Sequence, residues 1–284
     1  MLFAVIGDPV SHSLSPGIHN AFFSMDGFSA YYRIFETNKE SLPALFKNAY
    51  FFGYRGFNVT SPFKPVVSQF CHRLSDEATF AMGCNTLVLK KNRIMGYMTD
   101  GVGLLSYLNY LALKPQKISA IAILGCGASA QSIAYSILKA GCPRIIILNR
   151  TPAKAIALKS RLEGHFKDLQ PKILTGPLKE QEEFLQDCPG IINCTRLGLF
   201  EEDPSPIKKR FVGNFDWVVD INYRCRNTKL AGYCSEKKIF YRNGLGMLFF
   251  QALEAHKLFR KFMASKEQVK YLFKSFLANN IVDK

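Results

Sequence analysis

The feature that most restricts the fold is a glycine-rich turn between two regular elements. Residues 121 to 130 read IAILGCGASA, which places the pattern G-x-G-x-x-A between a predicted strand, Ile118 to Leu124, and a predicted helix, Ser129 to Ala140. In such a turn the first glycine permits the bend, the second lets the backbone approach a pyrophosphate, and the small third residue lets the helix pack closely. The turn therefore predicts a dinucleotide site at the helix N-terminus.

The stretches after this turn continue to alternate between strand and helix. Strands are predicted at Arg144 to Leu148, Gly190 to Asn193 and Trp217 to Asp220, and a helix at Pro152 to Glu163. Strands that are apolar throughout and separated by helices indicate a parallel sheet covered on both faces. We therefore predict a doubly wound Rossmann-type domain over residues 104 to 245.

The first hundred residues contain shorter units. The predicted strands and helices are Leu2 to Ile6, Pro16 to Met25 (helix), Tyr31 to Phe35, Lys39 to Tyr50 (helix), Gly56 to Val59, Asn85 to Leu89 and Arg93 to Tyr97. We predict a second α/β domain over residues 1 to 103, completed by C-terminal helices in residues 246 to 284 and separated from the first by a cleft. A chain of 284 residues is long enough for two domains.

The residues that end the strand at 144 to 148 distinguish two nicotinamide cofactors. Asn149, Arg150 and Thr151 follow this strand, and Lys154 comes shortly after. An NAD-binding fold usually carries an acid here for the ribose 2′-hydroxyl, and none is present. A guanidinium instead matches the oxygens of a 2′-phosphate, so the sequence favours NADP(H).

Composition and charge exclude several classes of protein. The chain carries 37 Lys and Arg against 22 Asp and Glu, but these charges are scattered and not interleaved with aromatic residues, so we expect no nucleic-acid partner. Apolar runs fall far short of the ~20 residues that span a bilayer, so we expect no membrane partner and a cytoplasmic location. The 8 cysteines form no C-x-x-C pair and no zinc spacing, which predicts reduced thiols and no metal.

Nine stretches, in the same order along nearly the whole chain, carry a resemblance to a known family. They are GDPVSHSLSPGIHN (7 to 20), GFNVTSPFK (56 to 64), CNTLV (84 to 88), GYMTDGVG (96 to 103), LGCGASA (124 to 130), NRTPAKA (149 to 155), IINCTRLG (191 to 198), DINY (220 to 223) and NGLGMLFFQA (243 to 252). The chain resembles the shikimate dehydrogenase family. The resemblance implies an enzyme of chorismate and aromatic amino acid biosynthesis that reduces 3-dehydroshikimate reversibly to shikimate with NADPH, as a monomer or homodimer.

The same resemblance assigns roles to individual residues. Lys64 and Asp100 would form the catalytic pair. Substrate would be bound by Ser13, Ser15, Thr60, Asn85, Tyr223 and Gln251, with both serines at its carboxylate and Tyr223 nearby. The cofactor would be bound by Gly125, Gly127, Ala128, Ser129, Ala130, Asn149, Arg150, Thr151, Lys154, Thr195 and Gly244.

The chemistry of Lys64 is consistent with this role. Hydride delivery to a ketone leaves developing negative charge on oxygen, which an ammonium stabilises and protonates. A nearby Asp100 favours the charged lysine, so we expect Lys64 to be mainly a charged donor and orienter. Each of these residues, considered alone, also has a structural interpretation. Lys64 could be a solvated surface lysine, Asp100 a turn or helix-capping residue, and Ser13 and Ser15 the start of a helix. His12 and His19 are interpreted as structural.

Four positions depart from the usual pattern of the family. They are Met98 in place of Asn, Ala128 in place of Gly, Arg196 in place of Ser, and Cys225 in place of Pro. Ala128 would weaken cofactor binding if its backbone needs a positive φ. Arg196 either contacts a cofactor phosphate or points to solvent. None of the four touches the Lys64/Asp100 pair, so we expect activity to be retained.

Two alternative functions stay open. A quinate or dual quinate/shikimate dehydrogenase of the same family would differ only in pocket contacts. A non-catalytic, NADP(H)-responsive regulator would bind DNA with a steep dependence on salt. The absence of an acid at residues 149 to 151 favours NADP and the biosynthetic activity, and the joint presence of Lys64, Asp100 and Gln251 disfavours a regulator.

Overall fold

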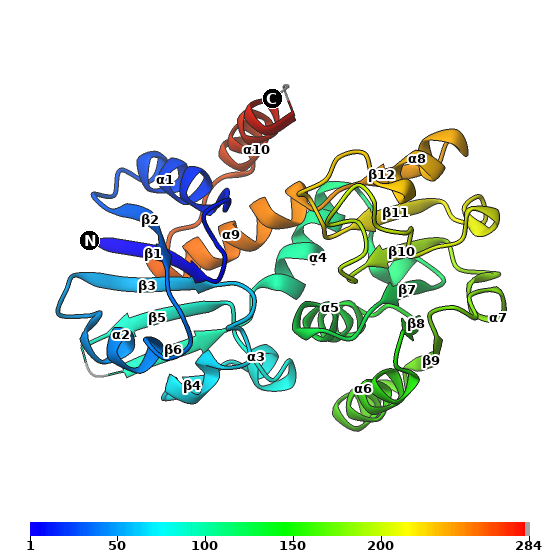
Figure 1. Ribbon diagram of the computed structural model, residues 1–284, viewed down its shortest axis with the longest axis horizontal. Helices are drawn as coiled ribbons and strands as arrows, with labels where there is room; N and C mark the ends of the chain where they lie inside the picture. Colours follow the sequence, from blue (N-terminus) through cyan, green and yellow to red (C-terminus); the bar gives the residue numbers. More distant parts are fainter. Residues whose placement is uncertain (92, 282–284) are drawn as a thin grey trace. The chain divides into compact units, whose positions relative to one another are not determined.

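The computed structural model describes residues 1–91 and 93–281 and divides into two compact units (Figure 1). Unit 1 consists of Met1–Gly103 with Leu248–Lys284, and unit 2 of Leu104–Met247. The last three residues of the predicted segment 246 to 284 lie outside the described residues. Each unit contains a six-stranded sheet with helices, which confirms the predicted α/β class. Among the described residues, no helix has the length and apolar character needed to cross a membrane.

Unit 1 is built on a mixed sheet with the strand order β2-β1-β3-β5-β6-β4. Its strands are β1 (Leu2–Gly7), β2 (Tyr31–Glu36), β3 (Tyr54–Val59), β4 (Arg73–Leu74), β5 (Thr86–Lys90) and β6 (Arg93–Tyr97). Its helices are α1 (Ser15–Met25), α2 (Leu42–Asn48), α3 (Asp76–Phe80) and α10 (Lys266–Ile281), and the unit boundaries fall within α4 (Asp100–Tyr110) and α9 (Leu245–Arg260).

The strand directions in unit 1 gather four loops at one edge of its sheet. β1 and β3 are parallel, β5 is antiparallel to β3, and β6 is antiparallel to β5. The carboxyl ends of β1, β3 and β6 and the amino end of β5 therefore share an edge. The loops at this edge contain residues 8–14, 60–64, 84–85 and 98–99, which include three of the six predicted substrate residues, Ser13, Thr60 and Asn85.

Buried aromatic rings hold the sheet of unit 1 against its helices. The ring of Phe3 on β1 lies 4.9 Å from Phe23 of α1 and 4.8 Å from Phe259 of α9. The outer edge of β2 is closed by Asn20, whose side chain accepts a hydrogen bond from the Tyr32 N–H at 2.8 Å and donates one to the Tyr32 carbonyl at 2.9 Å. The amide thus takes the place of a neighbouring strand and protects the sheet edge.

His19 is a packing residue in this core. Its ring stacks on Tyr32 with centroids 4.2 Å apart, and it is fully buried. Neither ring nitrogen has a hydrogen-bond partner within the part of the chain that the structure describes. Burial, and secondly the nearby His256, holds the pKa of His19 well below its usual value of 6.5.

We expect the protein to lose stability as the pH falls below about 6.5. The unfolded chain binds a proton at His19 from that pH downward, but the folded chain does so only at a much lower pH. Each pH unit below 6.5 therefore lowers the free energy of unfolding by up to about 1.4 kcal/mol for this one group. Urea denaturation at pH 7.5 and 5.0 measures the loss. The loss of unfolding free energy between the two pH values should be smaller in His19→Phe, which keeps a stacked ring, and unchanged in the control His12→Gln. An equal loss in His19→Phe and wild type would contradict the expectation.

Unit 2 is built on a fully parallel sheet with the order β12-β11-β10-β7-β8-β9. Its strands are β7 (Ile121–Leu124), β8 (Arg144–Asn149), β9 (Lys172–Pro177), β10 (Gly190–Asn193), β11 (Trp217–Asp220) and β12 (Phe240–Arg242). Its helices are α5 (Ala128–Lys139), α6 (Pro152–His165), α7 (Glu182–Leu185) and α8 (Lys229–Glu236).

This order confirms the doubly wound Rossmann-type prediction. Numbered within the unit, the strands run 3-2-1-4-5-6, and the order reverses between β7 and β10. Every residue of β7, β10 and β11 is buried, which requires cover on both faces of the sheet. Because all strands are parallel, their carboxyl ends share one edge, and ligands of such sheets bind at that edge near the reversal.

Some predicted bounds differ from those observed. The helix predicted over Lys39 to Tyr50 is only α2, because the Asn38 side chain accepts a hydrogen bond from the Ser41 N–H at 2.9 Å and holds residues 39–41 in a turn. The strand predicted from Ile118 begins at Ile121, since Pro115–Lys117 forms a short 3₁₀ turn just before it. The predicted strands at 93 to 97, 190 to 193 and 217 to 220 have the observed bounds.

Candidate active site

Lys64 and Asp100 meet at the loop edge of the unit 1 sheet. Lys64 lies in the loop after β3, and Asp100 is the first residue of α4, where the helix N-terminus favours negative charge. The Lys64 Nζ to Asp100 Oδ2 distance is 2.6 Å, and the two side chains are 19% and 5% exposed. The lysine is thus neither isolated nor freely solvated: a nearly buried carboxylate holds an ammonium that still reaches the surface.

Asn85 fixes the second oxygen of Asp100. Its Nδ2 donates to Asp100 Oδ1 at 2.7 Å. Its Oδ1 accepts from the Thr99 N–H at 2.8 Å and from Thr86 Oγ1 at 3.1 Å. The carboxylate therefore has a partner on each oxygen, and the Asn85 amide is itself held in one orientation.

Gln251 reaches the same cluster from α9. Its Oε1 lies 3.4 Å from both Asn85 Nδ2 and Thr99 Oγ1, and its Nε2 donates to the Leu248 carbonyl at 2.9 Å. Gly103 on α4 lies against the Gln251 backbone, and any Cβ at Gly103 would overlap it. This close helix contact places Gln251 among the polar partners that a partly buried amide needs.

The serine loop is linked to this cluster by a chain of hydrogen bonds. The Tyr32 hydroxyl interacts with Ser15 and donates to Asn58 Oδ1 at 2.8 Å. Asn58 Nδ2 in turn donates to Thr86 Oγ1 at 2.9 Å, and Ser13 Oγ accepts from the Ser15 N–H at 3.3 Å. Burial raises the pKa of Tyr32 well above its usual value, so its hydroxyl remains a donor.

Four buried polar residues of this cluster have no role among the predicted site residues, although three of them lie within the quoted stretches. They are Tyr32, Asn58, Thr86 and Thr99. Asn58 gave the clearest signal available in the sequence, since a lone amide in the otherwise apolar residues 56–59 of β3 needs buried partners. The identity of those partners depends on strand register, in which Asn58 lies opposite Thr86.

The glycine turn of unit 2 has the geometry of an anion site. Gly125 has φ +106°, and a Cβ there would lie 3.0 Å from the Cys194 carbonyl oxygen. Gly127 caps α5 with an ordinary φ of −70°, and nothing lies within 4 Å of the position of a Cβ. Ala128 begins α5 and has no positive φ, so its methyl group causes no backbone strain. The open N-terminus of this helix, with Ser129 and Ala130 in its first turn, fits a pyrophosphate.

Two basic side chains follow β8, and one of them lies near the glycine turn. Arg150, Thr151 and Lys154 are exposed after β8, and Asn149 Nδ2 donates to the Thr151 carbonyl at 2.9 Å, which closes the turn. Burial raises the pKa of the Cys126 thiol to about 11, and Lys154 opposes this rise, which puts its charge near the glycine turn. The polar and basic side chains of residues 149–154 fit the 2′-phosphate of NADP.

The neighbouring loops of unit 2 contain the remaining predicted residues. The Thr195 N–H and Oγ1 donate to Asn193 Oδ1 at 3.0 and 2.7 Å. Gly244 donates its N–H to the Asn222 carbonyl at 2.9 Å, and a Cβ there would overlap the Ile221 carbonyl. Tyr223 belongs to unit 2, whereas the other predicted substrate residues belong to unit 1. Among the departures, Met98 is buried, Cys225 half-buried and Arg196 exposed.

Asp220 is a buried carboxyl group at the end of β11. Its Oδ1 accepts from Asn193 Nδ2 at 3.0 Å and from the Asn222 N–H at 2.9 Å. Its Oδ2 has no hydrogen-bond partner among residues 1–91 and 93–281. Burial raises the pKa of Asp220 to about 6 from its usual 3.8.

We expect Asp220→Asn to stabilise the protein increasingly as the pH rises from 4 to 7.5. The unfolded chain releases the Asp220 proton from about pH 4 upward, whereas the folded chain keeps it up to a pKa of about 6, so the wild type loses stability between these two pH values and not above them. The amide keeps the Oδ1 acceptor and does not titrate. The variant minus wild-type difference in the free energy of unfolding should therefore grow by roughly 3 kcal/mol over this range. Urea denaturation at both pH values checks it, and a difference that does not change with pH would contradict it.

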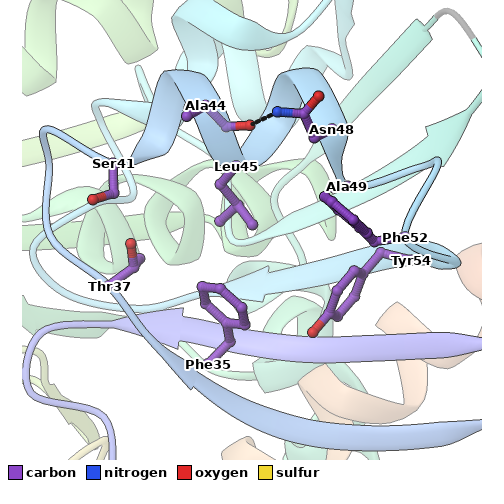
Figure 2. Close-up of a pocket in the computed structure, with 9 residues that line it drawn as sticks. All are labelled: Phe35, Thr37, Ser41, Ala44, Leu45, Asn48, Ala49, Phe52 and Tyr54. Atoms are coloured by element: carbon purple, nitrogen blue, oxygen red, sulfur yellow. Dashed lines mark hydrogen bonds between the residues drawn. The ribbon is translucent and has the colours of Figure 1, made fainter.

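A groove of about 390 Å³ lies elsewhere in unit 1, between α2 and the ends of β2 and β3. Figure 2 shows its mainly apolar lining, with Phe35, Leu45 and Tyr54 pointing into it and Asn48 bonded back to the Ala44 carbonyl on α2. None of the predicted site residues lines this groove. It is therefore separate from the Lys64 cluster.

The fold, the Lys64/Asp100 cluster of unit 1 and the glycine turn of unit 2 define a class of protein. It is an α/β protein with a Rossmann-type dinucleotide unit and a second unit that holds a Lys/Asp pair. Comparisons with known proteins agree with this class. The family described as "Shikimate dehydrogenase substrate binding domain" matches residues 5–87, and that described as "Shikimate / quinate 5-dehydrogenase" matches residues 111–196.

Similar proteins carry consistent names. The shikimate dehydrogenase (NADP(+)) of Aquifex aeolicus is 33% identical over 257 residues, which cover 90% of each chain. That of Pyrococcus abyssi is also 33% identical, over 90% of this chain and 91% of the relative. A crystal structure of the Thermus thermophilus enzyme with NADP(H) and shikimate is 28% identical and covers 98% of this chain and 100% of that one, with a TM-score of 0.83. The chain belongs to the shikimate dehydrogenase family.

Proposed function

We propose that this protein is an NADP-dependent shikimate dehydrogenase that reduces 3-dehydroshikimate reversibly to shikimate. The observation that best supports this is the Lys64/Asp100 pair, 2.6 Å apart and surrounded by the amides of Asn85 and Gln251. A positioned cation next to polar groups suits a polyhydroxylated ketone. The names of the relatives support the same reaction.

In this proposal the polar cluster of unit 1 binds the substrate. The substrate carboxylate binds at Ser13 and Ser15, and its hydroxyls bind at Thr60, Asn85, Asp100 and Gln251. The family motif assigns Tyr223 to the same carboxylate. The chain through Tyr32 and Asn58 keeps the serine loop and the catalytic pair in a fixed relation.

Lys64 and Asp100 stabilise negative charge on the reacting oxygen and transfer a proton to it. NADPH, when bound, supplies the hydride. The Lys64 ammonium donates a hydrogen bond to the substrate carbonyl, stabilises the negative charge that develops on its oxygen, and passes a proton to it. Asp100 orients the ammonium through Oδ2 while Asn85 holds Oδ1. In the reverse direction the same pair accepts the hydroxyl proton of shikimate.

The cofactor binds to unit 2. Gly125, Gly127, Ala128, Ser129 and Ala130 would hold its pyrophosphate at the N-terminus of α5, where the position of a Cβ at Gly127 is open. Asn149, Arg150, Thr151 and Lys154 would hold its 2′-phosphate, and Thr195 and Gly244 would complete the site. Unit 1 is thus the substrate-binding domain and unit 2 the NADP-binding domain.

The proposed activity also implies a cellular location, an oligomeric state and a set of partners. A biosynthetic reductase of small metabolites acts in the cytoplasm, as a monomer or homodimer, and needs no nucleic acid. A net charge of +15 attracts the anionic substrate and cofactor. Salt-sensitive binding of duplex DNA by the purified protein would argue against this part.

NADPH formation at pH 8 to 9 tests the proposed function. Purified protein is given shikimate or quinate, each with NADP or NAD. Rapid turnover only with shikimate and NADP supports the proposal. Equal turnover of quinate would assign the dual activity, and an absence of turnover despite NADP binding would contradict catalysis.

A further inference from the structure

Two thiols lie side by side next to the candidate active site. Cys71 Sγ and Cys84 Sγ are 3.9 Å apart, and both cysteines are free. They flank Gly96, where a Cβ would lie 2.7 Å from Cys71 Sγ and 3.1 Å from Cys84 Sγ. The glycine leaves the space between the two sulfurs open, so no side chain separates them.

The two thiols differ in access and in acidity. Cys71 is half-buried and Cys84 is buried. The contact with Cys84 lowers the pKa of Cys71, while the same contact and burial raise the pKa of Cys84. By contrast, burial raises the pKa of Cys126, Cys188 and Cys234. Cys71 is therefore the thiol that a peroxide can reach first, and Cys84 Sγ, 3.9 Å away, is placed to react with it next.

We propose that Cys71 and Cys84 are a modification site for hydroperoxides, at which oxidation forms a reversible disulfide. The Cys71 thiolate attacks one peroxide oxygen, the O–O bond breaks, and hydroxide leaves, so that Cys71 becomes a sulfenic acid. The Cys84 sulfur then attacks the Cys71 sulfur, the S–O bond breaks, and water leaves. Overall, two thiols and one hydrogen peroxide give one disulfide and two waters, and a dithiol reductant restores the thiols.

Disulfide formation would displace the catalytic cluster. A disulfide needs an S–S distance of about 2.05 Å, so the sulfurs must approach each other from 3.9 Å. Cys84 directly precedes Asn85, and its N–H donates to the Lys64 carbonyl at 3.0 Å. A shift of about 1 Å in a catalytic group costs up to ~100-fold in rate, so we expect oxidation to lower turnover at least ~10-fold. This loss of turnover rests on the proposed function; the disulfide itself does not.

Treatment of the whole protein with hydrogen peroxide tests the proposal. Non-reducing peptide mapping should show the Cys71–Cys84 cross-link in wild type and in the control Cys225→Ser, which removes another half-buried thiol, but not in Cys71→Ser. Turnover of shikimate should fall in the two proteins that cross-link and recover with dithiothreitol. Cys71→Ser should keep its turnover through the treatment. In Cys84→Ala, Cys71 should be trapped by dimedone as a sulfenic acid.

Each outcome separates the two proposals. A cross-link in protein that never turns over shikimate would support the thiol chemistry while contradicting the proposed function. Peroxide treatment that yields no Cys71–Cys84 peptide, or only sulfinic acid at Cys71, would overturn the modification site. A complete cross-link with unchanged turnover would overturn its effect on the catalytic cluster.

Discussion

Replacement of Lys64 by alanine is expected to lower kcat for shikimate oxidation by about 10²- to 10⁴-fold. The variant loses the group that stabilises the developing charge and transfers the proton, while Asn85, Gln251 and the serine loop still bind the substrate. We therefore expect the KM for shikimate to change much less than kcat. Steady-state kinetics with NADP at saturation measure both constants.

The matched control for this variant is Lys209→Ala. Lys209 and Glu236 form an ion pair of the same 2.6 Å length as Lys64 and Asp100, but their side chains are 53% and 55% exposed. Exposed pairs contribute little to stability, so this variant should fold and turn over like the wild type. Undiminished turnover in Lys64→Ala, or an equal loss in Lys209→Ala, would refute the role of Lys64.

Replacement of Arg150 by alanine is expected to weaken NADPH binding by about 10- to 100-fold. A hydrogen bond between charged groups contributes about 1.5–3 kcal/mol, and the guanidinium is the group best suited to a 2′-phosphate. NADH lacks that phosphate, so its weaker binding should not change. Fluorescence titration of both nucleotides measures the ratio of the two dissociation constants.

Arg210→Ala serves as the control for Arg150. Arg210 is another exposed arginine of unit 2, and its guanidinium pairs with Glu182 of α7 at 3.1 Å. Its removal should affect neither nucleotide. Equal losses of NADPH and NADH affinity in Arg150→Ala would show that the side chain does not select the phosphate.

The architecture of unit 2 could be predicted because its signals are local. An apolar strand, a glycine turn and a helix follow one another within residues 121–139, and β10 and β11 are short apolar runs between polar loops. β9 and β12 could not be predicted in this way. β9 ends in Gly176 and Pro177, and β12 is three residues long with Phe240 exposed at the sheet edge, so neither has the apolar pattern of a buried strand.

The candidate site was predictable only where the family motifs name its residues. These motifs single out Lys64, Asp100, Asn85 and Gln251, and the structure brings all four together. The hydrogen bonds of Asn58 and Thr86 depend instead on how β3 and β5 align, which no local pattern encodes. The Cys71–Cys84 contact likewise depends on strand pairing around Gly96 and has no spacing signature.

The most direct test of the central claim is to identify the product formed from 3-dehydroshikimate and NADPH. The purified protein is incubated with both, and the mixture is analysed by NMR. The proposed function predicts one shikimate for each NADPH consumed by the wild type, and almost none with Lys64→Ala. Unchanged 3-dehydroshikimate in the presence of folded, NADPH-binding wild-type protein would contradict the claim that the Lys64/Asp100 site reduces this ketone.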